Sequence, residues 1–74
     1  MNIDNLVRMA NQIGTFFESF TDRDEALEGI AGHLMKFWDP RMRRQLVEYI
    51  ENSATPELAD IVRESIETHK PRLV

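Results

Sequence analysis

Apolar residues recur along this chain in steps of three and four, the spacing that places side chains on one face of an α-helix. Four segments show this pattern, and short polar or proline-containing breaks separate them. No segment alternates apolar and polar residues with a period of two, so strands are not predicted. The sequence therefore predicts an all-α fold, a small bundle of four short helices joined by tight turns, approximately over residues 3–20, 23–38, 40–51 and 56–69.

Residues that start or stop helices occupy the breaks. Asp22 is placed to cap the second helix by accepting from backbone N–H groups of the next turn. Asp39 and Pro40 end the second helix and open the third, because proline disfavours the helical conformation in the residue before it and suits the first helical position. The fourth helix is expected to begin after a cap at Thr55 and to stop before Pro71.

The apolar stripe of the first predicted helix is wider than contact with one core requires. Met9 and Phe16, seven residues apart, form a second row beside the main apolar face. A helix placed between its own fold and a partner shows this pattern. In the second predicted helix, Gly29 and Gly32 are expected to let another helix approach closely.

Length and composition narrow the functional classes. The chain has 74 residues, a net charge of −4 and no cysteine, which indicates one small globular domain over residues 1–74. The missing cysteines exclude disulfides, thiolate-held iron–sulfur clusters and a cysteine nucleophile. A chain with room for one core is not expected to be a self-contained enzyme. No window approaches the roughly 20 apolar residues of a membrane span, so a cytoplasmic protein is expected.

The side chains that carry most enzyme chemistry do not form a recognisable set. His33 and His69 are the only imidazoles, and they lie on different predicted helices without a glutamate three residues before either. No glycine-rich turn presents a hydroxyl nucleophile or cradles a phosphate. The sequence therefore predicts no catalytic, cofactor-binding or metal-ligating residue on this chain.

The corner between the second and third predicted helices is the most informative stretch. It combines tryptophan, methionine and three arginines, residue types enriched at protein interfaces. One hypothesis is that Trp38 and Met42 insert into a partner; the alternative is that Trp38 caps the small core and the arginines form a solvated face. Composition alone favours neither. The predicted partner interface consists of Phe37, Trp38, Pro40, Arg41, Met42, Arg43 and Arg44, with Met9 and Phe16 as a second candidate.

The same arginines also fit a different class of function. Arg41 and Arg44 lie three residues apart near the start of a helix that follows a short turn, as in a recognition helix. The acidic net charge argues against phosphate binding, so nucleic acid is not the expected partner. A stand-alone helical protein-binding adaptor or weak nucleic-acid-binding regulator remains the alternative function.

Two runs of sequence resemble the delta subunit of soluble NAD-dependent formate dehydrogenases. The first is Leu-Val-Arg-Met-Ala-Asn-Gln-Ile at residues 6–13, followed by Phe16 and Phe17. The second and more specific run is Phe-Trp-Asp-Pro-Arg-Met-Arg at residues 37–43, with Ile30, Ala31 and His33 before it. The resemblance covers residues 5–50, and residues 51–74 match it only in being helical.

The resemblance implies a non-catalytic, cofactor-free accessory subunit of a cytoplasmic bacterial complex that oxidises formate and reduces NAD. In that family the alpha subunit carries a molybdenum or tungsten bis-pterin cofactor and iron–sulfur clusters, and the beta and gamma subunits carry FMN and further clusters. The chain would then dock on the alpha subunit and support assembly, cofactor retention or stability. When isolated, it is expected to be able to form a homodimer that covers exposed aromatic residues.

Overall fold

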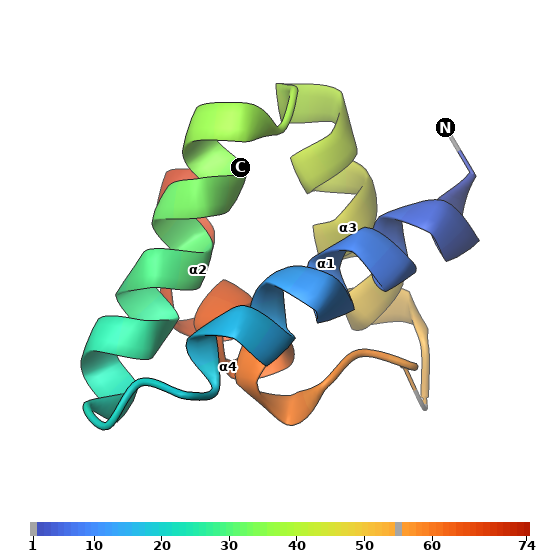
Figure 1. The fold of residues 1–74 in the computed structure, drawn as a ribbon. Coiled ribbons are helices and arrows are strands. Elements are labelled where there is room, and N and C mark those ends of the chain that lie inside the picture. The colour runs from blue at the N-terminus through green and yellow to red at the C-terminus, as the bar shows by residue number, and fades with distance from the viewer. Residues whose placement is uncertain (1, 55) are drawn as a thin grey trace.

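The computed structural model describes residues 2–54 and 56–74 of the chain (Figure 1). Within these residues there are five helices and no strand, which confirms the predicted all-α class. The helices are α1 (Ile3–Phe17), α2 (Arg23–Phe37), α3 (Pro40–Asn52), α4 (Asp60–Thr68) and α5 (Lys70–Leu73).

The helices surround one core. Figure 1 shows α1 and α2 diverging from the turn that joins them, with α3 at the open end between them. The most extensive helix contact joins α2 to α4, and the short helix α5 packs against α2, α3 and α4. Between these helices lies one cluster of buried apolar side chains, drawn from all five helices and from the connections at Trp38 and Leu58. One side of α1 and one side of α2 therefore lie outside this core.

Gly14 lets α1 and α4 pack closely. A Cβ atom built at Gly14 would lie 2.5 Å from Val62 Cγ2 and 3.3 Å from Ile61 Cγ2. Val62 is fully buried, so it has little room to move away. The glycine that weakens the middle of α1 by about 1 kcal/mol relative to alanine is therefore required by packing.

Gly14→Ala is expected to lower the free energy of unfolding by up to about 2 kcal/mol, because overpacking costs about 1–3 kcal/mol and exceeds the gain in helix propensity. Gly32→Ala is the matched control. A Cβ atom there meets nothing within 4 Å, so this variant should gain about 0.5–1 kcal/mol. Urea unfolding of both variants checks the prediction, and equal stability of the two would contradict it.

Two helix starts are confirmed in atomic detail. The Asp22 carboxylate accepts from the backbone N–H of Glu25 at 3.2 Å and caps α2. The Asp39 carboxylate accepts from the backbone N–H of Arg41 at 2.7 Å and caps α3, in which Pro40 is the first residue. These bonds satisfy N–H groups that have no partner inside the helix, so both starts are set by local sequence.

The first helix is shorter than the predicted range of 3–20. It ends at Phe17, with Glu18 as the C-cap residue, and the backbone N–H of Phe20 bonds to the carbonyl of Phe17 in a turn. Phe20 therefore leaves the helix, and its ring lies against those of Phe16 and Phe17. Contact among the three aromatic rings accompanies the early end of the helix.

The range 56–69 predicted for the fourth helix is also wrong at its start. Helix α4 begins at Asp60, and residues 56–59 are not helical. Two backbone N–H groups of this segment already have side-chain partners: Tyr49 Oη accepts from Glu57, and Asn11 Oδ1 accepts from Ala59. Leu58, between them, is buried in the core. The cap predicted at Thr55 lies outside the described residues.

A fifth helix, α5, follows α4, and the sequence pattern does not predict it. His69 ends α4, and Pro71 is the second residue of α5. Buried Leu73 anchors α5, and Arg72 donates to both carboxylate oxygens of Glu28 at 2.8 Å. This hydrogen bonding holds the pKa of Glu28 below its usual range. Because the pKa of Glu28 is lower in the folded state, its ionised carboxylate stabilises the fold at pH values above the pKa of the unfolded state. This stabilisation is lost as the pH falls through the pKa of the folded state.

Candidate docking surface

The corner from Phe37 to Arg44 is divided between the core and the surface. Trp38 is only 5% exposed and belongs to the core cluster, and Met42 packs half-buried against that cluster. Neither side chain is available to insert into a partner in this fold. The structure therefore corrects the hypothesis of a Trp38 anchor and supports the alternative, in which Trp38 completes the core.

Arg43 is used inside the chain. Its guanidinium donates to the carbonyls of Met35 and Trp38 at 3.1 Å each, and to that of Leu73 at 3.4 Å. Carbonyls at the end of a helix have no intrahelical partner, so Arg43 supplies donors to the end of α2 and ties α5 to it. Arg43, one of the predicted interface residues, thus has its hydrogen bonds within its own chain.

The other corner residues face outward. Phe37, Pro40, Arg41 and Arg44 are exposed, and the Phe37 side chain is the most exposed large apolar residue described, at 71%. The prediction that the corner contacts a partner stays a prediction for these four residues. Their exposure makes them accessible without any change in the fold.

Exposed aromatic rings also gather at the end of α1. Phe16 is 65% exposed, and its ring centroid lies 5.0 Å from that of Phe17 and 5.9 Å from that of Phe20. Phe20 and Met9 are each 37% exposed. Aromatic area left in water at this density on a small chain is typical of a surface that a partner covers.

A shallow groove links these rings to α2. One hollow of about 270 Å³ lies between the helices and is lined by Ile13, Phe16, Phe17 and His33. The ring of Phe17 lies directly on Gly29, where an added Cβ would come within 2.3 Å of it. The close neighbour of Gly29 is therefore an aromatic ring at the end of α1 and not the backbone of another helix, and the expected close approach at Gly32 is wrong, because an added Cβ there meets nothing within 4 Å.

The groove continues along α2 to Phe37. A second hollow of about 280 Å³ shares Phe17 and His33 with the first and adds Gly32, Lys36 and Phe37 to the lining. The His33 and Phe37 ring centroids lie 4.8 Å apart. We call these two joined hollows the aromatic groove. Phe16 and Phe37 belong to two separate predicted interfaces, and both line this groove.

Sequence reasoning missed part of this groove. Phe17 and His33 line both hollows, and neither is among the predicted interface residues. The sequence does contain a pattern that could have predicted the groove. Three phenylalanines lie near the end of the first helix and two glycines, Gly29 and Gly32, lie on the second, and small residues leave room for large ones. Met9 lies on α1, but it does not line either hollow.

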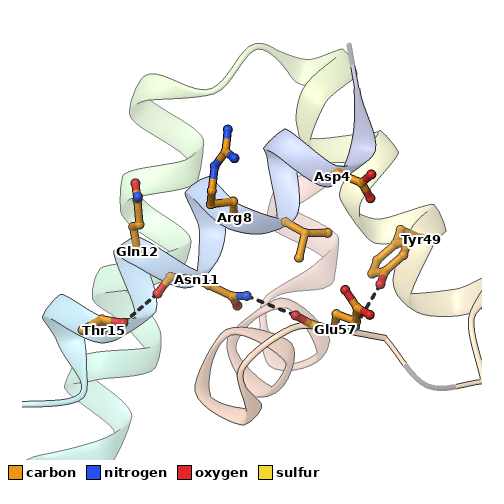
Figure 2. Close-up of a pocket in the computed structure, with 8 residues that line it drawn as sticks. Asp4, Arg8, Asn11, Gln12, Thr15, Tyr49 and Glu57 are labelled. Atoms are coloured by element: carbon orange, nitrogen blue, oxygen red, sulfur yellow. Dashed lines mark hydrogen bonds between the residues drawn. The ribbon is translucent and has the colours of Figure 1, made fainter.

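A larger hollow lies on the other flank of α1, and its role is structural. It measures about 380 Å³, and the residues that line it include Asn11, Tyr49 and Glu57 (Figure 2). Asn11 donates to the carbonyl of Glu57 at 3.0 Å and accepts from the N–H of Ala59 at 2.8 Å. Figure 2 shows Arg8 pointing away from these bonds. The polar groups thus hold the segment before α4 in place.

Asn11→Ala is expected to lower the free energy of unfolding by about 1–3 kcal/mol, because it leaves two backbone groups of residues 57–59 without their partner. Asn11→Asp keeps the acceptor for Ala59 but loses the donor to Glu57, so it should also destabilise the chain. Thr15→Ala is a nearby control that removes a solvent-exposed bond to the carbonyl of Asn11. Thermal unfolding in which Asn11→Ala matched Thr15→Ala would contradict this role.

One comparison with known proteins identifies the family. The model of a family described as "NADH-dependant formate dehydrogenase delta subunit FdsD" matches residues 5–66. This span includes most of α1, all of α2 and α3, and most of α4. The chain belongs to this family. No curated protein and no solved structure matches it.

The family match covers more of the chain than the resemblance, which spans residues 5–50. It extends to Ile66, and it includes the whole aromatic groove, from Ile13 on α1 to Phe37 on α2. For a formate dehydrogenase delta subunit, the groove is therefore part of the shared sequence region. Helix α5 lies beyond that region.

Two features are absent from residues 2–54 and 56–74 of this delta subunit. No group of three or more histidine, cysteine, aspartate or glutamate side chains in this part of the chain could hold a metal ion. None of the helices described is long and apolar enough to cross a membrane.

Proposed function

We propose that this delta subunit is a non-catalytic accessory subunit of a cytoplasmic NAD-dependent formate dehydrogenase and docks on the catalytic alpha subunit. The observation that carries the proposal is the aromatic groove, an apolar surface within the family-matched region that leaves Phe16 and Phe37 mostly exposed. Burial of such rings against a partner is a major source of binding free energy.

The proposal assigns all redox chemistry to other chains. In the hollow of about 380 Å³, Asn11 bonds to the chain's own backbone, a structural use of its polar group that suits this proposal. In the proposed complex, bis-pterin with molybdenum or tungsten, iron–sulfur clusters, FMN and NAD lie on the other subunits.

The proposed role is support of assembly, cofactor retention or stability of the complex. A chain of 74 residues has a small core, so a partner that buries the groove would stabilise the chain as well as the complex. Mutual stabilisation of this kind suits a subunit whose function is structural.

Expression of the formate dehydrogenase complex with and without this chain tests the proposal. Without the chain, we expect a lower yield of assembled complex and lower formate-dependent reduction of NAD per alpha subunit, measured together with the metal and pterin content. The purified chain alone should show no activity. Full assembly, cofactor content and activity in its absence would overturn the accessory role.

A further inference from the structure

Gly32 marks a space in the aromatic groove that the chain itself does not fill. Of the three glycines, Gly14 accommodates Val62, and Gly29 accommodates the ring of Phe17. A Cβ atom at Gly32 meets no atom within 4 Å. No described side chain therefore covers α2 at Gly32, which lines the same hollow as the exposed ring of Phe37. Within residues 2–54 and 56–74, no side chain fills this space.

The charges of the groove favour a partner with carboxylate groups. His33 and Lys36 are the titratable side chains among the described residues that line it, and no carboxylate lines it. Lys36 makes no ion pair with any residue in 2–54 or 56–74. On a chain of net charge −4, this makes the groove locally basic. A second copy would bring two Lys36 side chains together, so charge disfavours self-association here.

We propose that the aromatic groove receives an amphipathic helix of the partner subunit, with apolar residues against Phe16 and Phe37 and an aspartate or glutamate that pairs with Lys36 beside Gly32. Apolar residues at helical spacing are the usual means by which a helix binds a groove between two other helices. This inference rests on the proposed function, and it specifies the surface and the chemistry of the partner.

Two substitutions test the groove without removing anything from the core. Gly32→Leu fills the open space and raises helix propensity, and Lys36→Glu reverses the unpaired charge. Arg8→Leu and Arg8→Glu make the matching changes at an exposed position of α1 that lines neither hollow of the groove. Each variant is co-expressed, with an affinity tag, together with the remaining formate dehydrogenase subunits. The dissociation constant of each purified chain from the alpha subunit is also measured at low and high salt.

We expect both groove variants to bind at least tenfold more weakly, and the two Arg8 variants to bind as the wild type does. Raising the salt concentration should weaken the wild type more than Lys36→Glu. Thermal unfolding of each variant confirms that the fold is kept. Wild-type binding by both groove variants would overturn this inference while leaving the proposed function intact.

Two other outcomes would change the conclusion about what binds in the aromatic groove. Failure of the wild-type chain to bind the complex would overturn the proposed function as well. Sedimentation of the isolated chain at twice its mass of 8.7 kDa, reduced to the monomer by Gly32→Leu, would assign the groove to a second copy and overturn the inference of a partner helix.

Discussion

Trp38→Ala is expected to unfold most of the isolated chain at room temperature. Trp38 is 5% exposed, and its side chain lies among the buried residues contributed by all five helices. Truncation of a buried tryptophan costs about 3–5 kcal/mol. A core in a chain of this length rarely supplies more than about 3–5 kcal/mol in total. The substitution therefore removes nearly all of the available stability.

Circular dichroism and urea unfolding of Trp38→Ala measure this effect. Phe37→Ala is the matched control, because it removes the neighbouring aromatic ring, which is 71% exposed, and it should change the stability by less than about 0.5 kcal/mol. A folded Trp38→Ala chain with nearly wild-type stability would show that the tryptophan is not part of the core.

Replacement of Phe16 and Phe37 together by serine is expected to weaken docking at least a hundredfold while leaving the fold intact. Each ring is mostly exposed, at 65% and 71%, so neither is needed to complete the core. A ring that a partner buries at the centre of an interface typically contributes about 2 kcal/mol or more, equivalent to about thirtyfold in affinity. Phe16 lines one hollow of the groove and Phe37 lines the other.

The control for this variant removes exposed apolar side chains outside the groove. Met35 and Val74 are exposed apolar residues that line neither hollow of the groove. Their double replacement by serine should leave the affinity for the alpha subunit within about threefold of the wild type. If both double variants lost affinity equally, general surface hydrophobicity, and not the groove, would account for the binding.

Local signals in the sequence predicted much of the fold. The three-and-four spacing defined the apolar faces, and short-range bonds from Asp22 and Asp39 fixed the starts of α2 and α3 within one turn. Such bonds join residues two or three apart, so the sequence alone contains both partners. The exposed position of Phe16 agrees with its place in the row beside the main apolar face of the first helix.

The remaining features depend on contacts between distant residues. Helix α4 starts late because Asn11 and Tyr49 bond to backbone groups 46 to 48 and 8 residues away along the chain. Trp38 is buried in a core cluster to which all five helices contribute, which composition at the corner could not reveal. The groove itself exists only when α1 lies against α2. Tertiary contacts of this kind override local pattern.

The most direct test of the central claim is the subunit composition of the complex that a tagged chain retains, determined by mass spectrometry after purification under mild salt. The account predicts recovery of the alpha subunit in a fixed ratio to the chain, with formate-dependent NAD reduction in the same fraction, and loss of both from the Phe16→Ser and Phe37→Ser double variant. A chain that purifies without the alpha subunit, alone or with other proteins, would contradict it.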